Sequence, residues 1–112
     1  MSNIIHHLVG GVYEKETRIP AGKTLVQHKH KYDHLSVLAS GSVIVDFPEM
    51  QITYNAPAVI TIRAGRNHGV RALTDAVWLC IHASSVADDD ALIGESSSDS
   101  EVKSVVVRLT GG

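Results

Sequence analysis

Apolar and polar residues alternate over most of the first 84 residues, in short runs separated by glycine, proline, asparagine and aspartate. A period of two is the pattern of a strand that buries one face, and no long 3.6-residue period occurs between residues 10 and 84. Nine strands are expected: Ile4–Val9, Tyr13–Ile19, Thr24–His30, Leu35–Ala39, Ser42–Phe47, Met50–Tyr54, Ala58–Ile62, Gly69–Leu73 and Val77–Ala83. So many short strands predict an all-β sandwich or small barrel rather than an open sheet.

The pattern changes after residue 84. Residues 85–101 carry six acidic residues and five serines, a composition typical of a solvated connection. Residues 102–112 then return to strand composition at Val102–Leu109, and an isolated strand needs a sheet edge to pair with. That edge belongs either to the same chain or to a second subunit. We therefore expect one barrel domain over residues 1–84, an acidic connection over 85–101 and a C-terminal strand within 102–112.

Composition excludes several classes of partner and leaves an ordinary globular protein. The 112 residues suffice for one domain with a modest core, and a formal charge of −2 gives no general attraction to nucleic acid or to an anionic membrane. Cys80 is the single cysteine, so no internal disulfide forms and the chain suits a reducing compartment. The first residues lack a basic flank and a cleavage signal, so the expected location is the cytoplasm.

Histidines provide the candidate chemistry. His28 and His30 are two positions apart in a predicted strand, so their side chains share a face at a backbone separation of roughly 6.6 Å and can converge on one metal ion. A polar connection at residues 31–33 can reverse the chain, which would bring His34 beside them. A fourth histidine, His68, follows a turn-rich segment at residues 63–67.

The segment from Gly22 to Gly41 resembles the first motif of the cupin superfamily. That motif is a glycine, five residues, His-x-His, three or four residues, a glutamate, six residues and a glycine. Every spacing is kept here, and only the glutamate is changed, to His34.

The second cupin motif is a glycine, five residues, Pro-x-Gly-x-x-His-x-x-x-Asn. It is matched at Gly65 and His68 only, because Pro57, Arg63 and Ala72 stand at its first glycine, its proline and its asparagine. The resemblance covers about residues 19–83.

This resemblance implies a double-stranded β-helix, the jelly-roll barrel of cupins, with a metal inside. Where cupins use three histidines and a glutamate as ligands, the matching positions here are four histidines: His28, His30, His34 and His68. One divalent transition metal per chain is then expected, and Fe, Ni, Cu, Zn and Mn all remain open. A homodimer is also expected, because related single-domain cupins often form one and a symmetric pair is the commonest oligomer.

Two classes of function follow from the resemblance. The first is a small metalloenzyme acting on a small oxygenated or enolisable molecule, with dioxygenase, isomerase or lyase chemistry. The second is a non-catalytic, metal-dependent module that binds or senses a small molecule. The fold does not choose between them, because cupins host both.

The remaining polar residues are interpreted as structural. Asp33 is assigned to the turn rather than to the metal, because it lies on the opposite strand face from His34. His6 and His7 are adjacent and so point to opposite faces; an exposed or interface position is expected for them. On the last predicted strand, Val77, Leu79 and Ile81 look like core, which favours a non-functional position for His82.

Other side chains have weaker functional interpretations. Cys80 has no identifiable neighbouring base and is expected to be an inert buried thiol. Two phenols and three guanidinium groups could contact a substrate, but surface or edge positions explain them adequately: Tyr32, Tyr54, Arg63, Arg66 and Arg71.

Overall fold

The computed structural model describes residues 3–27, 32–66, 68–84 and 103–108, and over these ranges the chain is built from strands. The strands are β1 (Asn3–Val9), β2 (Val12–Ile19), β3 (Thr24–Gln27), β4 (His34–Ser40), β5 (Ser42–Asp46), β6 (Gln51–Asn55), β7 (Ala58–Ile62), β8 (His68–Ala72), β9 (Ala76–Ala83) and β10 (Lys103–Arg108). The described ranges hold no helix that could span a membrane.

The all-β prediction is confirmed, and β1 to β9 correspond to the nine predicted strands. Their described ends agree with the prediction to within one residue, and β10 lies inside the predicted Val102–Leu109. The last three residues of the predicted strand Thr24–His30 lie outside the described residues.

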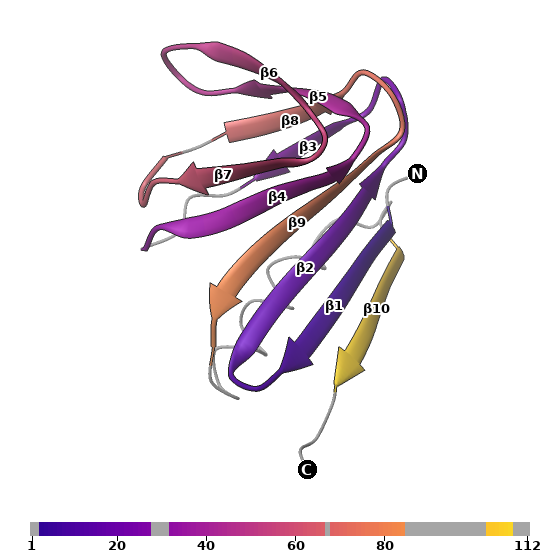
Figure 1. Cartoon of the computed structure of the whole chain (residues 1–112), viewed down its shortest axis with the longest axis vertical. Helices are drawn as coiled ribbons and strands as arrows, with labels where there is room; N and C mark the ends of the chain where they lie inside the picture. The colour runs from indigo at the N-terminus through magenta and orange to yellow at the C-terminus, as the bar shows by residue number, and fades with distance from the viewer. Residues whose placement is uncertain (1–2, 28–31, 67, 85–102, 109–112) are drawn as a thin grey trace.

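Ten strands form two sheets that pack face to face (Figure 1). The larger sheet has the order β10-β1-β2-β9-β4-β7, and the smaller has the order β3-β8-β5-β6. All pairings are antiparallel except that of β10, which runs parallel to β1 of the same chain. Consecutive strands β4 and β5 belong to different sheets, so the chain crosses repeatedly between the layers, as in a jelly roll.

The core lies between the two sheets and takes one face of six strands. Its buried members come from β2, β4 and β5 and from β7, β8 and β9: Ile19, Leu38, Val43, Val45, Ile60, Ile62, Val70, Ala72, Ala76, Trp78 and Cys80. Trp78 is the largest fully buried side chain and sits on β9, the strand between β2 and β4. Because successive side chains of a strand point to opposite faces, the apolar residues on one face of these strands all point to the interior.

The two faces of β9 are the reverse of the sequence interpretation. Trp78, Cys80 and His82 are buried in the interior, whereas the aliphatic residues between them are only half-buried on the outer face. Both faces of β9 carry apolar side chains, so hydrophobicity alone pointed to the aliphatic set. The neighbouring sheet decides the direction, because only the inner face of β9 meets the second layer.

The turn between β4 and β5 depends on Gly41. Its φ is +85°, and a Cβ built on it would overlap the backbone carbonyl oxygen of Asp75. The amide of Ala56 donates to the Gly41 carbonyl oxygen at 3.0 Å, and the amide of Ser42 donates to Thr74 Oγ1 at 3.0 Å. This turn is thus held against the β8–β9 connection, which aligns β4 beside β9.

A second, smaller buried cluster lies on β1 and β2, around Leu8 and Tyr13. His6 is fully buried there, and its Nδ1 lies 2.6 Å from the Tyr13 hydroxyl. The expected exposed position is therefore wrong for His6, because the inner face of β1 is covered. Burial lowers the pKa of His6 to about 4, with smaller contributions from the charges of Lys15 and His7.

Replacing Gly41 with alanine should lower the free energy of unfolding by more than about 3 kcal/mol, because left-handed strain adds to the overlap with Asp75. The matched control is Gly22→Ala, which has a similar φ of +83° but open space at its Cβ and should cost only about 1–2 kcal/mol. Urea unfolding measures both. Equal losses would contradict the close approach at Gly41.

His6 should make the fold sensitive to acid. Its pKa is about 4 in the folded chain and 6.5 when unperturbed, so the unfolded chain binds the proton first and stability falls from pH 6.5 to pH 4. Over this interval the wild type should lose on the order of 2 kcal/mol more than a His6→Gln variant, whose amide can still bond Tyr13. Urea unfolding of both proteins at a series of pH values tests this prediction. If their free energies of unfolding changed in parallel with pH, the prediction would be wrong.

Candidate metal centre

His34 and His68 begin two strands that belong to different sheets. His34 is the first residue of β4 and His68 is the first residue of β8, so both lie at the same end of the barrel, on the left in Figure 1. Their side chains are 6% and 4% exposed, and the ring centroids are 6.4 Å apart. Two of the four predicted ligands therefore face one another across the interior.

His28 and His30 lie outside the described residues, but the strand before them is described. Gln27, the last residue of β3, pairs directly with His68 in the smaller sheet. The chain therefore leaves β3 beside His68 and returns at Tyr32, two positions before His34.

The donors His34 and His68 fit a transition metal. Metal–nitrogen bonds of about 2.0–2.1 Å allow two imidazoles on one ion to have centroids up to roughly 6.5 Å apart, so the observed 6.4 Å is at the upper end of this range. Neutral imidazole is a preferred ligand of Fe, Ni, Cu and Zn.

His82 is a member of this site that the sequence interpretation had set aside. Its ring stacks on His34 with centroids 4.7 Å apart, and on Tyr13 at 5.7 Å. Tyr32 meets the same ring edge-on at 5.7 Å. The signal in the sequence was its position two residues after Cys80 and four after Trp78, on the face that proved to be interior.

Asp33 connects the start of β4 to the loop before His68. Its Oδ1 accepts a hydrogen bond from the amide of Ala64 at 2.7 Å, and Arg63 lies 3.9 Å from its other oxygen. The Asp33 side chain is about half exposed. This geometry agrees with a role in the turn, which ties the two histidine-bearing segments together.

Aromatic and charged side chains surround His68 on its other side. The Phe47 ring lies 6.1 Å from the His68 ring, and the guanidinium of Arg66 sits 4.2 Å above the centre of Phe47. Arg66 also pairs with Glu49. The rim next to His68 thus carries a guanidinium held by stacking and by an ion pair.

The other singled-out side chains lie farther from the two rings or at the surface. Cys80 is buried, with its thiol 3.6 Å from Ser36 Oγ. Tyr54 packs half-buried against the core, and Arg71 is exposed on β8. None of the buried polar residues among those described is a carboxylate, so an acidic general base is absent from that set.

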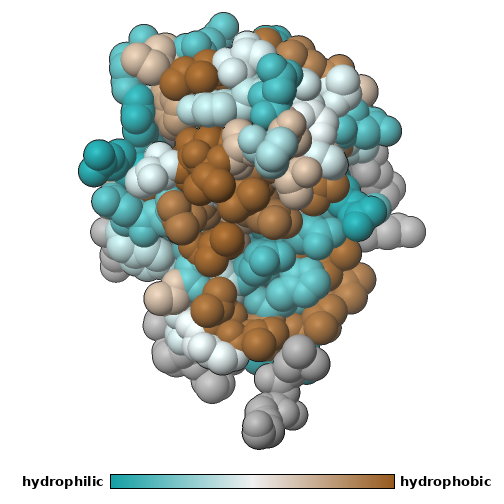
Figure 2. Space-filling model, in the orientation of Figure 1, coloured by the Kyte–Doolittle hydropathy of each residue, from teal (hydrophilic) through white to brown (hydrophobic). Residues whose placement is uncertain are grey.

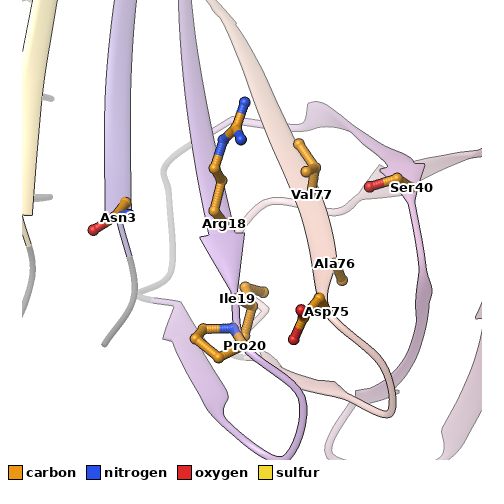
Figure 3. A pocket seen from close by; sticks show the side chains of 8 residues that line it. All are labelled: Asn3, Arg18, Ile19, Pro20, Ser40, Asp75, Ala76 and Val77. Atoms are coloured by element: carbon orange, nitrogen blue, oxygen red, sulfur yellow. The ribbon is translucent and has the colours of Figure 1, made fainter.

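A hollow of about 280 Å³ lies at the opposite end of the larger sheet (Figure 3). It is lined by Asn3, Arg18, Ile19, Pro20, Ser40, Asp75, Ala76 and Val77. Ser40 ends the strand that His34 begins, so the hollow is roughly 20 Å from the histidines along β4. No histidine or cysteine is among its lining residues, which separates it from the candidate metal centre.

Comparisons at the level of sequence find nothing: no family model and no curated protein matches the chain. Solved structures do match. A cupin superfamily protein from Desulfitobacterium hafniense has a TM-score of 0.60 at 16% identity, over 66% of this chain and 68% of that one. KdgF from Halomonas sp. has a TM-score of 0.61 at 14% identity, over 72% of this chain and 77% of that one.

A third similar structure is salicylate 1,2-dioxygenase from Pseudoaminobacter salicylatoxidans. Its TM-score is 0.60 at 10% identity, and the match covers 65% of this chain but only 21% of that one. Identities this low show a shared fold and nothing finer. The chain therefore has the jelly-roll fold of the cupin superfamily.

Proposed function

We propose that the chain binds one divalent transition metal per barrel through His28, His30, His34 and His68. The observation that carries this proposal is the pair of buried imidazoles, His34 and His68, facing each other from two sheets at 6.4 Å. The pairing of Gln27 with His68 supports it further, because His28 is the next residue in the chain. The metal is one of Fe, Ni, Cu, Zn or Mn.

The metal-bound protein acts, in this proposal, as a small metalloenzyme on an oxygenated or enolisable small molecule, with dioxygenase, isomerase or lyase chemistry. A divalent ion supplies Lewis-acid polarisation of a substrate oxygen. Four neutral imidazoles leave the full charge of the ion uncancelled, whereas the usual glutamate would remove one unit. The likeness to a salicylate 1,2-dioxygenase supports chemistry of this class as a proposal.

In the metalloenzyme proposal, the residues around the histidines have distinct roles. His82 orients the His34 ring by stacking, and Asp33 holds the loop before His68 against β4. Arg66, fixed over Phe47, offers a cation at the rim that can attract an anionic substrate. The Tyr32 phenol, next to His82, is the described hydroxyl best placed to meet a substrate at that end.

The second candidate function is a non-catalytic module that binds or senses a small molecule through the metal. One observation favours it: no carboxylate is found among the described buried polar residues, so the usual acidic general base is missing there. Under this reading the partner is still a small molecule. Neither candidate involves nucleic acid or a membrane, and both suit the cytoplasm.

A homodimer is proposed through the outer face of the larger sheet. Leu35, Val37, Val59 and Leu79 lie together there, because Val37 pairs with both Val59 and Leu79 and Leu35 is two residues away on the same face. Val59 is 70% exposed and Leu35 is 45% exposed. Figure 2 shows the brown area over this part of the sheet. We call these four residues the outer patch; a second copy would cover it.

The enzymatic proposal has two readouts. Elemental analysis should find that a His28→Ala and His30→Ala double variant, and separately His34→Leu, lose one equivalent of metal per chain. His34→Glu should keep that equivalent, because a carboxylate oxygen is an equally acceptable ligand. The matched control is His6→Gln, a buried histidine outside the ligand set. Equal metal content in all variants would overturn the assignment.

The second readout is turnover. Metal-free protein is loaded with each of the five ions and incubated in D₂O with small 2-oxo acids, 2-hydroxy acids and hydroxyketones. NMR follows hydrogen exchange beside the carbonyl, and an oxygen electrode follows dioxygen uptake. At least one metal-loaded form should convert a substrate faster than the free metal ion does. The rate of the His34→Leu variant should be about 100-fold lower than that of the wild type. Tight metal binding without turnover above free metal would instead favour the binding module.

The dimer proposal is checked by analytical ultracentrifugation. The wild type should sediment at twice the chain mass of 12.0 kDa, and a Leu35→Lys and Val59→Lys double variant should sediment as a monomer, because buried lysines would be unpaired at the interface. Val26→Lys is the control, since Val26 is 73% exposed on β3 of the other sheet. A monomeric wild type, or a dimeric double variant, would contradict the proposal.

A further inference from the structure

A second group of potential metal ligands lies on the outer face of the β1–β2 hairpin. Residues alternate faces along β1, so His7 points outward where its neighbour His6 points into the interior. His7 pairs directly with Glu14 on β2, and Glu16 follows two residues later on the same face. One ligand atom from each of His7, Glu14 and Glu16 lies within 4.8 Å of the others.

The surroundings of this group are apolar. Val107 pairs with His7 from β10, Ile81 pairs with Glu14 from β9, and Leu79 pairs with Glu16. Figure 2 shows a hydrophilic area bordered by brown on the lower half of this face, where β1 and β2 run in Figure 1. The Glu16 side chain is only 16% exposed. Carboxylates flanked by aliphatic side chains need compensating charge.

Among the residues that the structure describes, the compensation of these carboxylates is incomplete. Arg18 Nε donates to Glu16 Oε2 at 3.1 Å, but the Arg18 side chain is largely exposed. The other oxygen, Oε1, lies 3.4 Å from His7 Nε2. That nitrogen is shielded from solvent and makes no hydrogen bond to the residues that the structure describes, so its lone pair is available to a cation.

We propose that His7, Glu14 and Glu16 form a second metal site, separate from the barrel histidines, that binds a divalent transition ion such as Zn²⁺. One imidazole and two carboxylates supply three ligands of types that Zn²⁺ accepts, which leaves a fourth position for water. A divalent cation would neutralise the second carboxylate and engage His7 Nε2. Because its ligands come from both β1 and β2, the cation would also stabilise the hairpin. The competing arrangement is an ion pair of His7, Glu16 and Arg18 without metal.

The site is tested with Zn²⁺ alone, by calorimetric titration of chelator-treated protein. The wild type should bind two equivalents, and a His34→Leu and His68→Leu double variant should keep the second. His7→Gln and Glu14→Gln should each weaken that second binding by at least about tenfold, because each removes one of three ligands. The matched control Asp46→Asn removes a half-buried carboxylate on the other sheet and should leave both equivalents unchanged.

A second measurement serves if a barrel variant does not fold. In wild-type protein, one of the two Zn²⁺ equivalents should shift the ring signals of His7 in two-dimensional NMR. In the Glu14→Gln variant, these signals should not shift. Unchanged His7 signals, or a Zn²⁺ stoichiometry that His7→Gln and Glu14→Gln do not alter, would overturn the proposal and leave the ion pair alone. Failure of the barrel site would appear differently, as binding that His34→Leu does not affect.

Discussion

The pairing of β9 with β2 on one side and with β4 on the other determines what the barrel interior contains. Tyr13 lies opposite His82 in the first pairing, and the register of the second brings His34 to the other side of the same ring. A slip of one residue along β9 would turn its histidine to the outside and carry an aliphatic residue inward. The row of stacked rings is therefore a consequence of strand register.

The charge balance of the centre follows from its donors. His34 and His68, the proposed ligands, lie on facing strands, and the buried polar residues that the structure describes include no carboxylate. An ion held there would retain more positive charge than one in a site with a glutamate, and would attract oxygen anions more strongly. The same lack of a carboxylate removes the commonest proton acceptor. Among the described residues, a phenol and an imidazole are then the groups at this end of the barrel that could transfer a proton.

The β1–β2 hairpin shows how one sheet can carry two environments. His6 and His7 are neighbours, yet the first hydrogen-bonds Tyr13 in the interior and the second faces two glutamates on the outside. Burial lowers the pKa of His6, because removal from water disfavours its charged form. Outside, the two carboxylates are shared between Arg18, His7 and the proposed cation. The strand period separates these two situations by a single residue.

The sequence by itself determined the strands, the turns and the positions of the candidate ligands. Alternation located nine strands to within a residue at their described ends, and the spacing of Gly22, His34 and Gly41 carried the resemblance to cupins. These features are local, because strand period and turn chemistry depend on near neighbours.

Only the tertiary structure decided which face of each strand is interior and which distant residues meet. Trp78 and His82 lie inside although the aliphatic residues between them are the more hydrophobic set, because the second sheet covers that face alone. The pairing of β10 with β1, the contact of His82 with His34 and the cluster of His7 with Glu14 and Glu16 all join separate strands. Such contacts depend on sheet order and register, which a period of two leaves open.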